Sequence, residues 1–315
     1  MTRKLIAIVG PTATGKTALG IALAHTLGGE IVGADSRQVY RHMDIGTAKP
    51  TPEERSLVRH HLIDVIDPDQ EFSLAQYLEL AVTALERMWS SGKQPLLVGG
   101  SGQYVWALLE GWTVPRLPPQ RELRQELEQR ATRQGAEALH RELAQVDPKA
   151  AARIDARNVR RVIRALEVHK ATGRPISYWQ EKGPPPWQTL ILGLTCPRQE
   201  LYERIDARVD AMMQAGLVDE VRRLLTMGYE SSLPSLSGIG YSQVCRHLAG
   251  ELSLATAVAR IKTATHRLAR QQYTWFRLND ERIRWIDVSL DKPFEKAARL
   301  VESELGLRGR VAHGR

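Results

Sequence analysis

Short apolar runs and amphipathic stretches alternate along the first part of the chain. The runs at 5–9, 30–34 and 95–100 have the length and composition of buried strands, and a less regular run at 60–68 predicts another strand. Helical patterns lie between these runs, with apolar residues on one face, as at 73–91. Strand–helix alternation is typical of a parallel sheet covered by helices on both faces. We therefore predict an α/β fold built on a doubly wound parallel sheet.

The pattern changes after Gly111. Pro115, Pro118 and Pro119 break the chain, and only helical patterns follow for about sixty residues. An apolar run at 189–195 then predicts a strand that returns to the sheet. We predict a first part of the core at residues 1–114 and an all-helical insertion at residues 115–187, for which the arginine stripe described below indicates a nucleic-acid partner. Residues 188–315 are predicted to return to the core and to add C-terminal arginine-rich helices.

The first predicted strand runs directly into Gly10-x-x-x-x-Gly15-Lys16-Thr17, and a helical pattern begins at once behind it. Strand, loop and helix in this order are the context of a phosphate-binding loop. Backbone N–H groups, the helix N-terminus and the lysine favour phosphate there, and the Thr17 hydroxyl is the expected Mg²⁺ ligand. A glycine turn before an ordinary helix is the alternative. We assign to phosphate binding Gly10, Pro11, Thr12, Ala13, Thr14, Gly15, Lys16 and Thr17.

Two further polar residues follow strands of the same predicted sheet. Asp35 comes directly after the strand at 30–34, and Ser101 follows a pair of glycines after the strand at 95–100. Open α/β sheets bind ligands at the carboxyl ends of their strands, so we expect Asp35 near the phosphate-binding loop. An N-cap role for Asp35 and a tight turn at Ser101 are the alternatives.

The net charge of +8 is unevenly distributed, because residues 1–115 carry slightly more acidic than basic side chains. Two helical patterns in the remainder, at 157–169 and 253–277, carry arginines on one face. These arginines are Arg157, Arg160, Arg161 and Arg164 in the first pattern, and Arg260, Arg267, Arg270 and Arg277 in the second. A solvated face is the ordinary interpretation, but two stripes that lack interleaved acids favour contact with a nucleic acid.

Composition excludes several classes of protein. No apolar stretch is long enough to span a membrane, and the start of the chain runs into a predicted strand, so we expect no signal peptide and a cytoplasmic protein. Cys196 and Cys245 form no CxxC pair, which indicates reduced core residues and no zinc site. His60 and His61 are strand neighbours whose side chains point to opposite faces, so we expect hydrogen bonds and no shared metal ion.

Several segments beyond the loop resemble sequence blocks of one family, the tRNA dimethylallyltransferases. The matching segments are residues 10–17, Ala34-Asp35-Ser36, residues 43–50, Val98-Gly99-Gly100, Arg164-Ala165-Leu166-Glu167-Val168, Glu220-Val221-Arg222, Gly240-Tyr241 and Arg270-Gln271-Gln272-Tyr273-Thr274-Trp275. The resemblance implies a P-loop NTPase-like fold and transfer of a dimethylallyl group from its diphosphate to N6 of the adenosine 3′-adjacent to the anticodon. It implies dimethylallyl diphosphate and tRNA as partners. With these partners we expect Mg²⁺ as cofactor and a monomer that does not bind membranes.

The resemblance also implies roles for single residues. Asp35 would act as general base and Arg222 would contact the diphosphate, with a surface ion pair as the alternative for Arg222. Ser101 stands where the family has a threonine that contacts the leaving group, and it keeps the hydroxyl. The predicted catalytic residues are thus Asp35, Ser101 and Arg222. We assign to tRNA binding Asp35, Ser36, Arg37, Gln38, Arg124, Arg160, Arg161, Arg164, Arg270 and Arg277.

Two other functions stay open on the sequence. A P-loop kinase of a small molecule or nucleotide would use residues 1–111 and leave both arginine stripes without a role. A nucleotide-gated RNA-binding protein without catalytic activity would use the stripes but would not need the Asp35 carboxylate. The family usually has leucine where Gln103 stands, and nothing in the sequence explains this glutamine.

Overall fold

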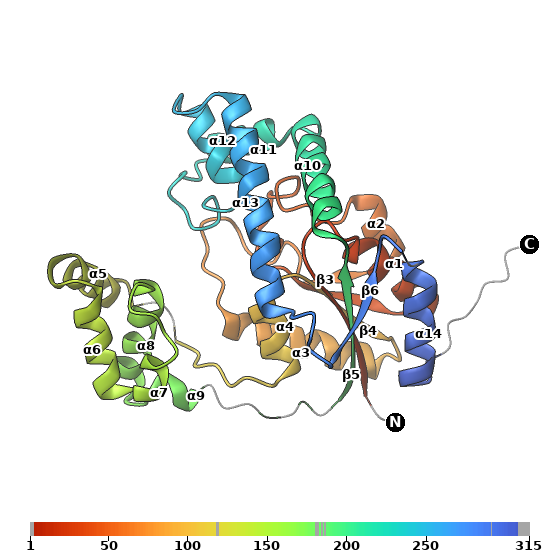
Figure 1. The fold of residues 1–315 in the computed structure, drawn as a ribbon, viewed down its shortest axis with the longest axis horizontal. Coiled ribbons are helices and arrows are strands. Elements are labelled where there is room, and N and C mark those ends of the chain that lie inside the picture. The colour runs from red at the N-terminus through yellow and green to blue at the C-terminus, as the bar shows by residue number, and fades with distance from the viewer. Residues whose placement is uncertain are drawn as a thin grey trace, which may run out of the picture. The chain divides into compact units, whose positions relative to one another are not determined.

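Six parallel strands form one sheet in the order β3-β2-β4-β1-β5-β6 (Figure 1). The computed structural model describes residues 3–117, 120–179, 183, 185, 187–290 and 292–307, so the predicted chain breaks at Pro118 and Pro119 lie outside the described residues. The strands are β1 Lys4–Val9, β2 Glu30–Ala34, β3 His60–His61, β4 Pro95–Gly99, β5 Gln188–Thr195 and β6 Ile283–Asp287. The predicted α/β class with its parallel sheet is confirmed.

The strand predicted at 60–68 is the one clear error of extent. β3 ends at His61, because Leu62 and Asp64 have φ of 63° and 56°, which no extended strand allows. The two histidines form separate hydrogen bonds as predicted: His60 Nδ1 lies 2.8 Å from the Val58 carbonyl, and His61 Nε2 lies 2.6 Å from Glu30 Oε2.

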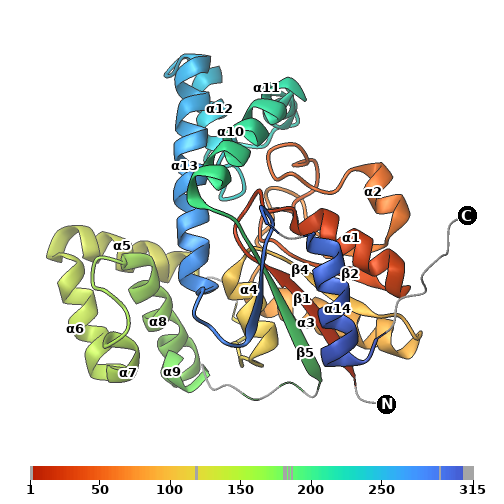
Figure 2. The ribbon, with the colours of Figure 1, turned by 45° about the vertical axis from the view of Figure 1, so that its right-hand side comes forward.

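Helices cover both faces of the sheet (Figures 1 and 2). On one face lie α1 Lys16–Leu27 and α14 Pro293–Leu305, whose apolar residues share a core with β1, β4 and β5. On the other face lie α3 Leu74–Ser90 and α4 Gly102–Leu109. The short helix α2 Pro52–Leu57 begins at a capping box formed by Thr51 and Glu54.

A second group of helices follows β5 along the chain. Its members are α10 Arg198–Gln214, α11 Leu217–Thr226, α12 Tyr241–Leu248 and α13 Leu254–Trp275. Their buried residues pack with Val39, Tyr40 and Met43, which come from the segment after β2. The helix α13 runs from α12 at one end to α4 at the other, so it joins this helical group to the sheet (Figure 1).

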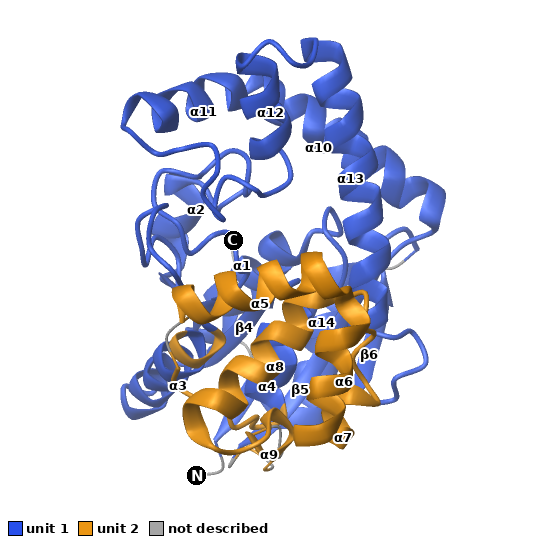
Figure 3. Ribbon diagram, turned by 90° about the vertical axis from the view of Figure 1, so that its left-hand side faces the viewer, with its two compact units in different colours: residues 1–73, 77–109, 186–315 blue, residues 74–76, 110–185 orange. Residues whose placement is uncertain are grey.

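Residues 110–185 fold with residues 74–76 into a compact helical unit of their own, shown in orange in Figure 3. Its helices are α5 Arg121–Gln134, α6 Ala136–Val146, α7 Pro148–Ala151, α8 Val159–Thr172 and α9 Ile176–Trp179. Leu127, Leu139, Leu143, Val162 and Leu166 form the centre of its core. The unit therefore has a hydrophobic core independent of the sheet.

Cys196 and Cys245 are buried free thiols, as the sequence predicts, and burial raises the pKa of both. Within the described ranges, no helix combines the length and the apolar character that crossing a membrane requires.

Candidate active site at the phosphate-binding loop

The loop between β1 and α1 has the backbone that anion binding requires. Gly15 is the N-cap of α1 and adopts the left-handed conformation, with φ of 84°. Gly10 has φ of 131°, and a Cβ atom there would lie 2.4 Å from the Leu194 carbonyl oxygen of β5. The loop therefore turns tightly over the end of the sheet and presents the N-terminus of α1 to any bound anion.

Lys16 folds back over this loop, and its ammonium donates a hydrogen bond to the Pro11 carbonyl at 2.6 Å. Burial of the ammonium and repulsion from Arg208 lower the pKa of Lys16 to about 7, although Asp35 opposes the shift. A partly buried cation without a carboxylate in its hydrogen-bonding shell is costly. The site is therefore prepared for an anion that would restore the full charge of Lys16.

We expect the affinity for inorganic diphosphate to fall by about tenfold per pH unit above pH 7, because Lys16 loses the proton that the bound anion requires. Isothermal titration calorimetry between pH 6.5 and 9 would measure this dependence. The matched variant Lys16→Arg carries a guanidinium that stays charged, so its affinity should change little over the same range. Equal slopes in both proteins would contradict the assignment to Lys16.

Asp35 lies at the end of β2, and its charge acts on both Lys16 and Arg208. Its Oδ1 accepts the Arg37 N–H at 2.8 Å, which makes a local turn, whereas Oδ2 has no partner among the described residues. The predicted proximity of Asp35 to the phosphate-binding loop is confirmed. One carboxylate oxygen thus fixes the turn and the other is available to a substrate.

Ser101 supports the same turn from the neighbouring strand. Its hydroxyl accepts the Ser36 N–H at 2.9 Å, and its own N–H donates to the Ala34 carbonyl at 3.0 Å. The side chains of Arg37 and Gln38 also bind the protein itself. The Arg37 guanidinium donates to the Pro234 carbonyl at 2.9 Å, and the Gln38 amide donates to the Thr47 and Ala48 carbonyls.

Arg208 is the functional candidate that the sequence analysis missed. It lies on α10, and its guanidinium is close enough to Lys16 to lower the pKa of that ammonium and close enough to Asp35 to be stabilised by its charge. Burial lowers the pKa of Arg208, and Asp35 opposes this shift. Two cations and a carboxylate are therefore gathered at the carboxyl ends of β1 and β2, where the cations can hold an anion and the carboxylate a proton.

Arg222, which the family resemblance assigns to the diphosphate, binds a neighbouring carboxylate in this structure. It is on α11, is largely exposed, and forms an ion pair with Asp219 one turn earlier on the same helix. The neighbouring Glu220 is buried and accepts N–H groups of Asp44, Ile45 and Gly46, at 2.9, 2.8 and 3.1 Å. In this sequence block the structure gives Glu220 a clear role, which is to anchor the segment at 43–50.

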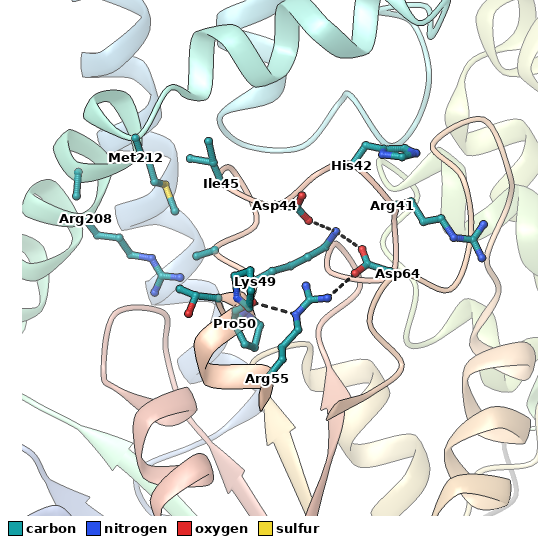
Figure 4. Close-up of a pocket in the computed structure, with 15 residues that line it drawn as sticks. Arg41, His42, Asp44, Ile45, Lys49, Pro50, Arg55, Asp64, Arg208 and Met212 are labelled. Atoms are coloured by element: carbon teal, nitrogen blue, oxygen red, sulfur yellow. Dashed lines mark hydrogen bonds and ion pairs between the residues drawn. The ribbon is translucent and has the colours of Figure 1, made fainter. Parts of the chain in front are cut away.

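The anchored segment forms one wall of a pocket of about 710 Å³, and Arg208 and Met212 of α10 form the other (Figure 4). Lys49 binds Asp44 and Asp64 at 2.8 and 2.6 Å, so its charge is neutralised within the wall. Burial raises the pKa of Asp64, but hydrogen bonds from Lys49 and Arg55 hold it below its usual value. Arg208 therefore belongs both to the pocket and to the charges around Lys16.

The arginine stripe predicted at 157–164 is only partly present. Arg157 precedes α8 and pairs with Asp155 at 2.6 Å. Arg164 donates to the buried Glu167 at 2.6 Å, and Arg124 of α5 donates to the same carboxylate through two nitrogens, at 2.9 and 3.0 Å. Arg124 and Arg164 thus neutralise a buried acid within the helical unit. Arg160 and Arg161 are exposed and, among the described residues, have no acidic partner.

The second stripe lies along α13. Arg260 and Arg267 line a groove of about 510 Å³ on this helix, together with Thr263 and Gln271. Arg270 donates to the Tyr202 hydroxyl at 2.7 Å and stays exposed, whereas Arg277 lies two residues beyond the end of the helix.

A divalent cation would find one protein hydroxyl at this site. Thr17 is half-buried in the first turn of α1, and its hydroxyl has no hydrogen-bond partner in the described part of the chain. No group of three or more His, Cys, Asp or Glu side chains suited to a metal ion occurs among the described residues. The donor set therefore fits a hard cation that takes its remaining ligands from phosphate oxygens and water.

Comparison with known proteins identifies the family. Residues 38–279 match the model of the IPP transferase family. The tRNA dimethylallyltransferase of Roseiflexus sp. (strain RS-1) is 56% identical over 273 residues, which are 87% of this chain and 90% of the relative. That of Thermomicrobium roseum is 52% identical over 303 residues, which are 96% and 92% of the two chains.

Solved structures agree with this result. The tRNA isopentenylpyrophosphate transferase of Bacillus halodurans has a TM-score of 0.70 and 41% sequence identity, covering 96% of both chains. A eukaryotic dimethylallyltransferase acting on tRNA has a TM-score of 0.82 at 24% identity, covering all of this chain and 82% of the other, and shows the shared fold. The chain belongs to the IPP transferase family.

Proposed function

We propose that this protein transfers a dimethylallyl group from dimethylallyl diphosphate to N6 of the adenosine 3′-adjacent to the anticodon of tRNA. The observation that carries the proposal is the grouping of Lys16, Arg208 and Asp35 beside an anion-binding helix N-terminus. The cations suit a diphosphate leaving group, and the carboxylate suits an acceptor that must lose a proton. The relatives named tRNA dimethylallyltransferase support the same reaction.

In the proposed reaction Asp35 acts on the acceptor, and Lys16 and Arg208 act on the leaving group. N6 of adenine is a weak nucleophile because its lone pair is delocalised into the ring. Asp35 takes a proton from N6 as N6 bonds to C1 of the dimethylallyl group, and the C1–O bond breaks with its electrons going to the diphosphate. Lys16, Arg208 and the backbone N–H groups of residues 13–17 stabilise the charge that develops on the leaving group.

Thr17 would hold a divalent cation, for which we propose Mg²⁺, at the diphosphate. When bound, this cation adds positive charge beside the leaving oxygens. We assign the pocket of Figure 4 to the donor, because it shares Arg208 with the charge cluster and its walls include Ile45, Pro50 and Met212.

For tRNA we propose contacts through the exposed arginines of both units, Arg160 and Arg161 in the helical unit and Arg260, Arg267 and Arg270 on α13. Cations without acidic partners can neutralise backbone phosphates. The target adenosine must leave its stack to reach Asp35, as in other enzymes that modify bases. The segment at 35–38 would then receive the flipped base.

Incubation with labelled dimethylallyl diphosphate and tRNA, followed by mass spectrometry of the nucleosides, tests the function. N6-isopentenyladenosine and free diphosphate are the expected products. The kinase alternative is not favoured by the relatives, and a parallel incubation with labelled ATP examines it directly. Phosphate transfer from ATP without prenyl transfer would overturn the proposal.

Replacing Arg160 and Arg161 together by Ala should weaken tRNA binding and reduce the log–log salt slope by about one unit for each lost phosphate contact. Filter binding between 50 and 300 mM salt would measure the slope. Arg164→Ala is the informative comparison, because Arg164 already binds Glu167. Its main expected effect is a lower melting temperature, since it leaves a buried carboxylate with one cation fewer. An unchanged salt slope in the double variant would show that Arg160 and Arg161 are ordinary solvated side chains that do not contact tRNA phosphates.

A further inference from the structure

The proposed reaction needs the phosphate-binding loop and Asp35 to keep a fixed separation, although they follow different strands. One side chain from a third element lies between the segments that carry them. Gln272 of α13 is only 8% exposed; its Oε1 accepts the Thr12 N–H at 2.8 Å, and its Nε2 donates to the Gly100 carbonyl at 3.0 Å. A single amide thus joins the phosphate-binding loop to the end of β4.

The glycines after β4 make room for this helix. A Cβ atom on Gly100 would lie 2.3 Å from Gln272 Nε2, and a Cβ atom on Gly102 would lie 2.2 Å from the Trp275 ring. Both positions are therefore glycine because side chains of α13 approach the backbone. Packing against α13 therefore explains the glycine-rich turn at 99–102.

The contact continues from Gly100 to the proposed general base. Ser101 is the next residue, and its hydroxyl accepts the Ser36 N–H at 2.9 Å. Asp35 precedes Ser36 and forms the same turn through the Arg37 N–H. A continuous path of hydrogen bonds and peptide links therefore runs from Thr12, through Gln272, Gly100 and Ser101, to Asp35.

We propose that Gln272 is a positioning residue that holds the phosphate-binding loop in register with Ser101 and Asp35. A neutral amide meets both requirements, since one end must accept from an N–H group and the other must donate to a carbonyl. Gln272 lies on the buried face of α13, while Arg260 and Arg267 line a groove on the same helix. One face of α13 is thus proposed to bind tRNA, and its buried face holds the phosphate-binding loop and Asp35 in position. The inference rests on the proposed function.

Two substitutions separate positioning from simple packing. Gln272→Met keeps the approximate shape of the side chain and loses both hydrogen bonds. Gln272→Glu keeps the acceptor for Thr12 but, when ionised, sets a second oxygen against the Gly100 carbonyl. A protonated glutamic acid can accept from Thr12 and donate to Gly100 as glutamine does, and burial raises the pKa of such a carboxyl.

The test measures kcat and KM for prenyl transfer between pH 6 and 8.5, relative to wild type at each pH. Misplacement of reacting groups by about 1 Å can cost on the order of 10²-fold, so we expect a loss of that size in kcat for Gln272→Met at every pH. Gln272→Glu should show a similar loss at pH 8.5 that shrinks as the pH falls to 6. Gln214→Met, at the exposed C-terminal residue of α10, serves as the matched control and should match wild type.

A second measurement does not depend on the acceptor. Calorimetry with inorganic diphosphate should show roughly tenfold weaker binding to Gln272→Met, because the loop is less well ordered. Unchanged kcat and unchanged diphosphate affinity in Gln272→Met would overturn the proposal, as would parallel pH profiles for the two variants. If the wild type forms no prenylated product, the proposed function fails, whereas the diphosphate measurement still decides whether Gln272 orders the loop.

Discussion

Replacement of Asp35 by Asn is expected to lower the rate of prenyl transfer by 10²- to 10⁴-fold, the usual contribution of a general base, while tRNA still binds. The substitution is nearly isosteric, and Asn can keep the hydrogen bond that Oδ1 accepts from the Arg37 N–H at 2.8 Å. It removes the capacity of Oδ2 to take a proton from adenine N6. Single-turnover kinetics with saturating donor would isolate this step from binding and product release.

Binding measurements make the result specific to catalysis. The tRNA affinity of Asp35→Asn should equal that of wild type, and Asp69→Asn, at an exposed acid outside the site, should retain full activity. Asp35→Ala should be equally inactive but less stable, because it also loses the turn. Near-wild-type turnover in Asp35→Asn would show that another group accepts the proton. If the protein binds RNA without catalysing a reaction, neither the wild type nor any of these variants would form prenylated product.

The sheet could be predicted from the sequence because its strands are short apolar runs bounded by clear signals. β2 matches its predicted range, and the phosphate-binding loop lies between strand and helix as expected. The end of β3 could not be predicted, since Leu62, the first residue after the strand, has positive φ although leucine rarely adopts it. Tertiary contacts impose that backbone, including the bonds of Asp64 with Lys49 and Arg55.

The site was predictable where its residues lie just after a strand, as Asp35 does, or at the end of the loop that follows one, as Lys16 does, since topology alone brings them to one edge. Arg208 stands in the middle of a helix with several other charged residues, and no motif distinguishes it there. Arg164 presents the opposite case. Its periodicity indicates a surface stripe, but its partner Glu167 is buried and a second arginine, Arg124, arrives from another helix. Such pairings depend on which helices pack together, which sequence periodicity does not specify.

Arg208→Ala should lower the rate of prenyl transfer by about 10²- to 10³-fold, the cost typical of losing one group that stabilises developing charge. Arg222→Ala tests the assignment that family resemblance made. Because Arg222 pairs with Asp219 on an exposed face, we expect its removal to matter far less than that of Arg208. Steady-state kinetics of the two variants under the same conditions give the comparison. An equal or larger loss in Arg222→Ala would support the sequence-based assignment.

The pH dependence of donor binding gives a second, independent signature of Arg208. Repulsion from Arg208 helps to hold the pKa of Lys16 at about 7, so its removal should raise that pKa. The decline in dimethylallyl diphosphate affinity should therefore begin at higher pH in Arg208→Ala than in wild type, while Arg222→Ala should decline as wild type does. Suppose that Arg208→Ala has lower turnover and that the midpoint of its affinity decline lies at higher pH than in wild type. General loss of structure could not explain this combination, because unfolding would weaken binding at every pH. If Arg208→Ala left the pH midpoint of donor binding unchanged, the Arg208 guanidinium would lie too far from Lys16 for both to bind the same diphosphate.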